Sequence, residues 1–229
     1  MFECQYNDEM EAEVLRLEAK GRDAAMKAVL SRKHWIFDLD GTLTVAVHDF
    51  KAIKEALGIP PGADILGYLE ALPPEESAPL HGKLDSIERE LSAKTSAASG
   101  AKELLSMLAE DDCVIGVLTR NTHAIARLTL ELTGLDGFFP EAAYIVGRHE
   151  AAPKPDPEGA LQLASLWNAD PDDIVFTGDY HYDLLCGRSI GAATIHVDSS
   201  GAFPWKALAD LQVTSLFEVA EMRKQILKL

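Results

Sequence analysis

Cysteine is scarce in this sequence, with three residues among 229. Cys4, Cys113 and Cys186 form an odd set without regular spacing, which excludes the disulfide framework of a small secreted domain. Cys113 begins an apolar run, and we expect it to lie in a buried strand. Such cysteine usage is typical of the reducing cytosol, so a cytoplasmic location is expected.

Long hydrophobic runs are also missing. No apolar stretch approaches the roughly 18 residues that a membrane-spanning helix needs. The first residues are rich in glutamate and aspartate, whereas a signal peptide begins with positive charge. We therefore expect a soluble protein that stays inside the cell and has no membrane partner.

Positive charge is under-represented as well. The chain has 21 lysine and arginine residues against 37 aspartate and glutamate residues, a formal net charge of -16. A surface this acidic repels nucleic-acid backbones and anionic lipids, so we expect neither as a partner. An anionic small substrate would need a local positive centre, supplied by a metal ion or by a few placed cations.

Apolar residues, in contrast, are abundant enough for a continuous core, at 47% of the chain. Short apolar runs alternate with helical patterns, and the runs are continuous rather than alternating in polarity. This pattern predicts an α/β fold with a doubly wound parallel sheet covered on both faces. The expected strands are 35–37, 113–118, 144–146, 174–176, 193–197 and a short 212–216, and the expected helices are 8–32, 122–132, 157–167, 182–190 and 218–227.

The stretch from 47 to 97 interrupts the alternation. It holds five prolines around short helical patterns and contains no convincing strand, which indicates a small helical cap inserted into the core. The helical patterns cover 50–57, 65–71 and 80–91. The expected domains are an N-terminal helical extension at 1–33, an α/β core at 34–46 and 98–229, and the cap at 47–97.

Polar side chains follow several predicted strands at the point where each strand ends. In an open parallel sheet these ends line one crevice, so the side chains are expected to converge there. Their oxygen-rich chemistry, without cysteine or histidine partners, favours Mg²⁺ over zinc. Gly41 allows a sharp turn whose N–H groups can hold phosphate oxygens. The converging residues are Asp38, Asp40, Thr119, Lys154, Asp179 and Asp183.

These residues resemble, in order, the four motifs of the haloacid dehalogenase superfamily. The segment 38–44 is similar to the first motif of its phosphatases, Thr119 to the second and Lys154 to the third. Gly178-Asp179 with Asp183 is similar to the fourth, and the resemblance spans about 34–200. It implies a Rossmannoid core with a small cap, in the manner of phosphoglycolate phosphatases.

The resemblance also implies a division of labour. Asp38 would be the nucleophile that forms an aspartyl-phosphate, and Asp40 the general acid and base. Mg²⁺ would be held by Asp38, Asp179 and the backbone carbonyl of Asp40, with Asp183 as an outer ligand or a brace for Lys154. Five residues would bind the phosphoryl oxygens or other parts of the substrate: Gly41, Thr119, Arg120, Asn121 and Lys154.

Some features leave alternatives open. Many similar phosphatases carry an acidic residue directly after the first motif, where this chain has Thr44 and Val45. The expected activity is Mg²⁺-dependent hydrolysis of a small phosphorylated metabolite, such as phosphoglycolate, a sugar phosphate or a nucleotide monophosphate. A phosphoryl-transferring sugar-phosphate mutase and a non-catalytic binding protein of the same fold are the alternatives. A monomer and a homodimer are both compatible with the sequence.

Overall fold

A single sheet of six parallel strands forms the centre of the molecule, which a computed structural model describes for residues 21 and 23–227. The strand order is β3-β2-β1-β4-β5-β6, which confirms the predicted doubly wound α/β fold. The strands are β1 (His34–Phe37), β2 (Val114–Leu118), β3 (Ile145–Val146), β4 (Ile174–Gly178), β5 (Ala193–Val197) and β6 (Leu211–Val213).

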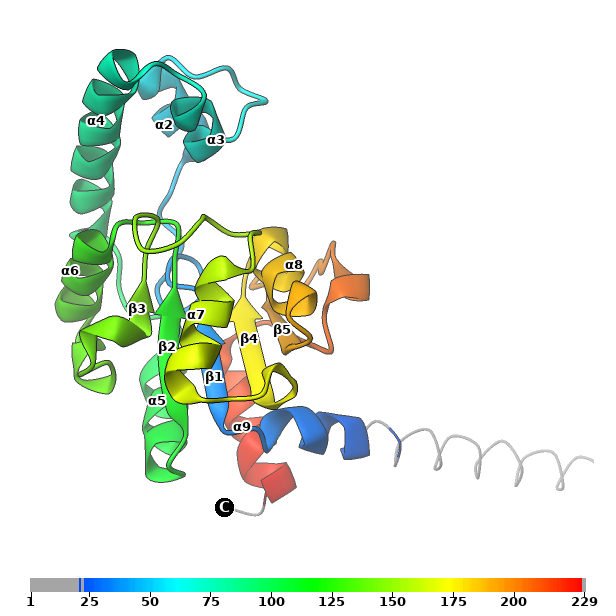
Figure 1. Ribbon diagram of the computed structural model, residues 1–229. Helices are drawn as coiled ribbons and strands as arrows, with labels where there is room; N and C mark the ends of the chain where they lie inside the picture. The colour runs from blue at the N-terminus through cyan, green and yellow to red at the C-terminus, as the bar shows by residue number, and fades with distance from the viewer. Residues whose placement is uncertain (1–20, 22, 228–229) are drawn as a thin grey trace, which may run out of the picture.

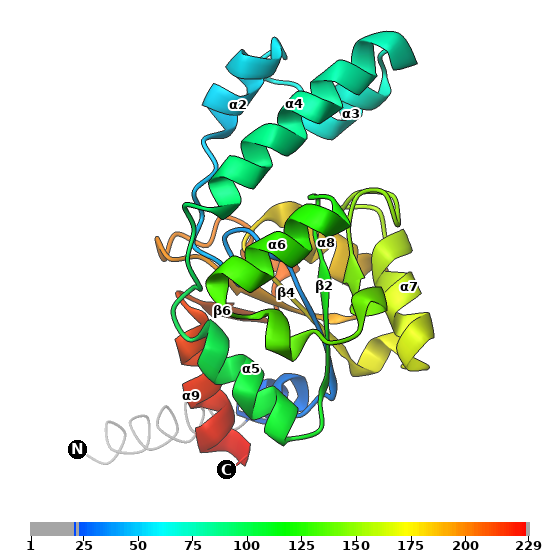
Figure 2. The same cartoon turned by 90° about the vertical axis from the view of Figure 1, so that its left-hand side faces the viewer.

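Helices cover both faces of this sheet (Figure 2). Trp35 and Phe37 point to one face and pack with α5, α6 and α9, whereas Ile36 points to the other and packs with α7 and α8. This two-sided burial explains why the strands are continuously apolar. The helices are α2 (Phe50–Leu57), α3 (Ile65–Glu70), α4 (Pro74–Ser92), α5 (Ala101–Glu110), α6 (His123–Thr133), α7 (Glu158–Trp167), α8 (His181–Ser189) and α9 (Leu216–Leu227), with 3-10 turns η1 (Asp136–Phe138), η2 (Ala142–Tyr144), η3 (Pro171–Asp173) and η4 (Lys206–Leu208).

Helices α2, α3 and α4 lie beyond the carboxyl ends of the strands (Figure 1). Their apolar side chains form a hydrophobic cluster separate from the two clusters of the sheet. Asp49 and Asp64 begin α2 and α3 as N-caps, accepting hydrogen bonds from Ala52 N and Gly67 N. The cluster consists of Ile53, Leu57, Ile59, Leu66, Leu69 and Leu84.

Several sequence-based boundaries differ from the structure. Helix α4 begins at Pro74 rather than near 80, because proline is well suited to the first helical position and Pro79 removes only one early hydrogen bond. Cys113 is partly exposed and lies just before β2, and β6 ends at Val213, so the predicted strand 212–216 was wrong beyond that residue. Helix α5 was not predicted.

The N-terminal prediction is testable only in part. Residues 21 and 23–30 are helical, whereas residues 31 and 32 lie past the end of the helix, so the predicted end at 32 was wrong. The remaining part of the predicted helix, 8–20 and 22, lies outside the described residues. Val29 and Leu30 are buried in the cluster that also contains Trp35. Across the part of the chain that the structure describes, no helix has both the length and the apolar character needed to cross a membrane.

Candidate active site

The sheet fixes two of the candidate side chains directly. The hydrogen-bond ladder continues one residue past β1 and β2, since Asp38 N donates to Thr177 O at 2.9 Å and Thr119 N donates to Val146 O at 3.0 Å. Asp38 and Thr119 are consequently held at the carboxyl ends of adjacent strands, and both are buried. Gly41 then adopts φ +93°, which glycine tolerates, and the chain turns back on itself.

Three carboxylates meet at these strand ends. Asp38, Asp179 and Asp183 each offer an oxygen within 4.8 Å of the others. The ammonium of Lys154 lies 2.5 Å from Asp38 Oδ1 and 2.7 Å from Asp183 Oδ1, and it donates to the carbonyl of Leu118 at 2.6 Å. The structure therefore brings together four residues that lie as far as 145 positions apart in the sequence (Asp38 to Asp183).

The electrostatics of this group call for a cation. Burial raises the pKa of Asp38 to about 7 and that of Asp179 to about 8, and the neighbouring carboxylates add to the effect. Burial alone would lower the pKa of Lys154, but Asp183 and Asp38 outweigh it and raise this pKa, so the ammonium stays charged. One ammonium leaves three crowded carboxylates under-neutralised, and their hard oxygen donors fit Mg²⁺.

Asp40 lies beside this group in a different environment. Its Oδ2 accepts a hydrogen bond from Asn121 Nδ2 at 2.7 Å, and His48 Nδ1 lies 4.0 Å from its Oδ1. Burial raises the pKa of Asp40 to about 6, although Lys154 and Asn121 oppose the shift. A carboxyl group with a pKa near neutrality is suited to both giving and taking a proton. Asn121 N, in turn, donates to the hydroxyl of Thr119 at 3.1 Å.

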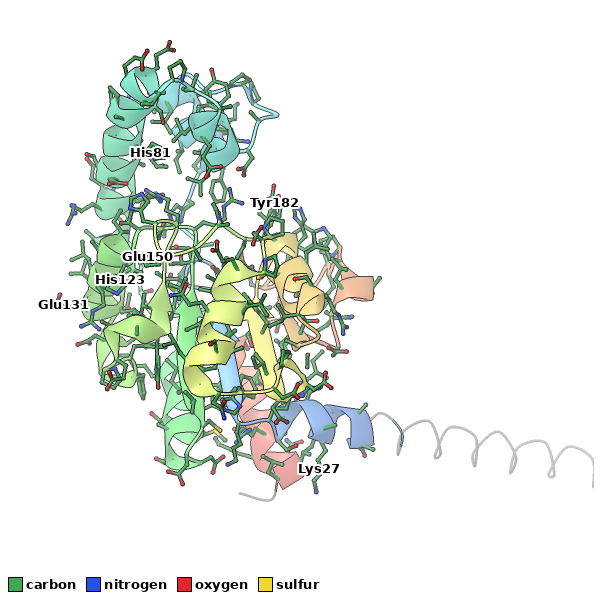
Figure 3. The ribbon with its side chains drawn as sticks, in the orientation of Figure 1. Lys27, His81, His123, Glu131, Glu150 and Tyr182 are labelled. Carbon is green, nitrogen blue, oxygen red and sulfur yellow. The ribbon has the colours of Figure 1, made fainter. Side chains whose placement is uncertain are left out.

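A cavity of about 380 Å³ opens in front of these side chains. Its floor contains the predicted residues Asp38, Asp40, Thr119, Lys154, Asp179 and Asp183, together with Arg120 and Asn121. Its walls are built mainly by α2, α3, α4 and the loops that join them, with Tyr180 and Tyr182 from the core. Figure 3 shows Tyr182 at the end of the core that faces these helices. Gly41 does not line the cavity, but it lies against the carboxylate of Asp179, which does.

The side chain of Arg120 does not point toward the expected phosphate position. Its Nη2 donates to both carboxylate oxygens of Asp64 at 2.6 and 2.7 Å, its Nη1 donates to the carbonyl of Lys154 at 2.8 Å, and its guanidinium lies 4.8 Å from the ring centre of Tyr182. The Arg120 side chain therefore bridges the core and α3. The family resemblance implies that the backbone N–H groups near Arg120, rather than its side chain, would bind phosphate.

Several cavity residues were not identified from the sequence as site residues. Glu88 of α4 lines the cavity and pairs with Arg148, which follows β3. Burial raises the pKa of Glu88 to about 7 even though Arg148 opposes it. Asp64 could have been recognised as a helix N-cap, but neither Glu88 nor Arg148 belongs to a motif, so the sequence held no signal for their pairing.

Comparison with known proteins identifies the family of this chain. The haloacid dehalogenase-like hydrolase family matches residues 50–197, more than half of the chain. The chain belongs to this family. This haloacid dehalogenase-like hydrolase is 29% identical over 198 residues to an uncharacterized hydrolase of Saccharomyces cerevisiae, covering 82% of this chain and 88% of that one.

Two further relatives extend the comparison. The N-acetylmuramic acid 6-phosphate phosphatase of Pseudomonas putida is 29% identical over 182 residues, with 71% of this chain and 81% of that protein covered. The crystal structure of a hydrolase from Pseudomonas syringae superposes with a TM-score of 0.70 at 25% identity, over 85% of this chain and 99% of that chain. This hydrolase is thus similar in sequence to a phosphatase and in fold to another hydrolase.

Proposed function

We propose that this hydrolase is a Mg²⁺-dependent phosphatase that cleaves small phosphate monoesters through an aspartyl-phosphate. The observation that carries the proposal is the buried Lys154 ammonium between Asp38 and Asp183, with Asp179 completing the carboxylate group. The N-acetylmuramic acid 6-phosphate phosphatase among the relatives supports phosphate-ester chemistry in this family. The proposed mechanism uses the residues in the roles that the sequence predicts.

In the first step, a carboxylate oxygen of Asp38 attacks phosphorus, the bond from phosphorus to the ester oxygen breaks, and Asp40 gives its proton to the departing alcohol. In the second step, Asp40 takes a proton from the water that attacks the aspartyl-phosphate, which releases inorganic phosphate and restores Asp38. The pKa of about 6 at Asp40 suits both roles near neutral pH. A positioned acid and base of this kind contributes about 10²–10⁴-fold to the rate.

The remaining residues would bind the metal ion and orient the phosphoryl group. Asp38, Asp179 and the backbone carbonyl of Asp40 would bind Mg²⁺, which when bound neutralises the carboxylates and draws negative charge from the phosphoryl group. Thr119, Lys154 and the N–H groups near Gly41 and Arg120 would hold the phosphoryl oxygens as charge shifts among them. Asp183 positions Lys154, because it contributes the second of the two carboxylates that contact the ammonium.

Residues 47–97 would act as the cap of this site. Side chains from α2, α3 and α4 line the cavity opposite the catalytic carboxylates, so a substrate phosphate on the floor would have its leaving group against these helices. Enclosure of this kind excludes water during the attack of Asp38. The substrate that this cavity would accept is therefore a small phosphorylated molecule.

The first test is hydrolysis of para-nitrophenyl phosphate by the wild type and by Asp38→Asn, with Mg²⁺ and with EDTA. We expect Mg²⁺-dependent release of nitrophenol by the wild type and none by the variant, since an amide oxygen is a poor nucleophile. Melting curves of both proteins verify that the variant is folded. Retained hydrolysis by Asp38→Asn would refute the nucleophile, and full activity in EDTA would refute the metal.

A further inference from the structure

The leaving-group side of the cavity is largely apolar. Aliphatic side chains from α2, α3 and α4 form its inner wall, and aromatic rings stand at its edge. Phe50 is 61% exposed and stacks on His48 at 5.7 Å, while Tyr180 is 47% exposed and meets Tyr182 edge-on at 5.2 Å. The aliphatic residues are Ile53, Ile65, Leu66 and Leu84. A volume of about 380 Å³ with rings at its edge fits a molecule larger than a two-carbon alcohol.

The charged side chains of these walls already have partners within the protein. Arg120 is paired with Asp64, and Glu88 is paired with Arg148. Lys54, the other cationic wall residue among the described residues, directs its ammonium to the carbonyl of Pro61 at 2.9 Å. The charges of Asp64 and Glu88 are thus cancelled by Arg120 and Arg148, and the ammonium of Lys54 is held by a backbone carbonyl.

Other groups of the protein also hold the side chains of Asp64 and Arg120 in place. Asp64 Oδ2 accepts the N–H group of Gly67 at 2.9 Å as the N-cap of α3. The guanidinium of Arg120 is fixed by the carbonyl of Lys154 at 2.8 Å and by the ring of Tyr182. A carboxylate on a substrate that approached Nη2 of Arg120 would compete with Asp64 for this group, and it would meet the negative charge of Asp64 as it approached.

From this arrangement we propose that the cavity selects phosphate esters of uncharged, ring-bearing alcohols, and that Asp64 is the residue that excludes leaving groups carrying a carboxylate. The inference rests on the proposed phosphatase activity and assigns its substrate class. Aryl and nucleoside phosphates belong to the accepted class, whereas phosphoglycolate, with its short anionic leaving group, belongs to the excluded one. Asp64 acts here through Arg120 and is a specificity-determining residue rather than a catalytic one.

A matched pair of substrates tests this assignment. The esters 4-carbamoylphenyl phosphate and 4-carboxyphenyl phosphate have nearly the same shape and differ by one negative charge. We expect the wild type to prefer the carbamoyl ester by about tenfold in kcat/KM, the size that a like charge at a partly exposed site produces. In Asp64→Asn the preference should fall to about one, because Arg120 is then free to accept the carboxylate while asparagine still caps α3.

Asp49→Asn is the control, since it makes the same change at the N-cap of the neighbouring helix α2, outside the cavity. It should keep the wild-type preference. Comparing the proteins with one another cancels the difference in reactivity between the two phenols. An equal preference in wild type and Asp64→Asn, or a wild-type preference for the carboxylate, would overturn the proposal.

Calorimetric titration separates this inference from the phosphatase proposal. The non-hydrolysable 4-carbamoylbenzylphosphonate and 4-carboxybenzylphosphonate are titrated into the Mg²⁺-loaded wild type and Asp64→Asn. Tighter binding of the carbamoyl compound by the wild type, lost in the variant, supports the assignment even if no ester is hydrolysed. Equal binding of the two compounds by the wild type, or no binding of either, contradicts it whatever the activity.

Discussion

Arg148 Nη1, from the segment after β3, donates to both carboxylate oxygens of Glu88 on α4 at 2.9 Å. The side chains are 2% and 8% exposed, so this ion pair joins helix α4 to the segment after β3 out of contact with most solvent. Arg148 also donates to the carbonyl of Arg120 at 2.9 Å, next to Thr119. The position of α4 is therefore coupled to the strand end that would hold phosphate.

Removal of one partner of this pair should destabilise the protein strongly. Arg148→Met leaves Glu88 buried without its cation, and breaking a buried pair in this way costs about 3–5 kcal/mol. Urea denaturation measures the change in the free energy of unfolding. The double variant Glu88→Gln/Arg148→Met, which removes both charges, should recover part of the loss. A midpoint for Arg148→Met equal to that of the wild type would show that the pair is dispensable.

The stability of the metal-free protein should fall as pH rises from about 5 to about 8. Folding raises the pKa of Asp38 to about 7 and of Asp179 to about 8 from an ordinary 3.8, chiefly by burial. The folded state then binds more protons than the unfolded state across this range, so raising the pH favours unfolding. Mg²⁺ should reverse the trend, because it binds the ionised carboxylates of the folded state.

Melting temperatures across this pH range, in EDTA and in Mg²⁺, provide the measurement. The double variant Asp38→Asn/Asp179→Asn is the control and should show a flatter profile in EDTA. A melting temperature of the metal-free wild type that rises steadily toward pH 8 would contradict the prediction.

Gly41→Ala should impair the site through two effects. The added Cβ would lie 2.3 Å from Asp179 Oδ2, and the backbone φ of +93° is strained for alanine. Strain of this kind costs about 1–3 kcal/mol, and displacement of Asp179 should weaken Mg²⁺ binding. Gly82→Ala in α4 is the matched control, because its Cβ would contact nothing within 4 Å. Mg²⁺ titration of phosphatase activity distinguishes the variants, and an unchanged half-saturation in Gly41→Ala would refute the displacement.

Asp183→Asn should lower activity by about 10–100-fold, the usual effect of removing a group that orients a direct contact. Asp183 holds the Lys154 ammonium at 2.7 Å and accepts the N–H group of Tyr180 at 3.0 Å. Steady-state kinetics with saturating Mg²⁺ provides the measurement, and Asp173→Asn, an exposed carboxylate at the opposite end of β4, is the control. Equal losses in the two variants would argue against a positioning role for Asp183.

The sequence by itself determined the sheet and the candidate residues at its carboxyl edge. Continuous apolar runs such as that before Asp38 are buried on both faces, a local pattern that predicts parallel strands. Because the ends of such strands lie along one edge, Lys154 and Asp179 could be placed near Asp38 without a structure. The start of α4 at Pro74 was missed, since proline reads as a helix breaker although it suits a first turn.

Only the tertiary structure decided how helices α3 and α4 meet the strand ends of the sheet. The pairs Arg148–Glu88 and Arg120–Asp64 join residues 60 and 56 positions apart, and each member alone is an ordinary charged residue of a helix or loop. Their distances depend on how α3 and α4 pack across the cavity, and that packing is a sum of many weak apolar contacts with no local sequence pattern. The charge that faces a substrate's leaving group was therefore set by the fold.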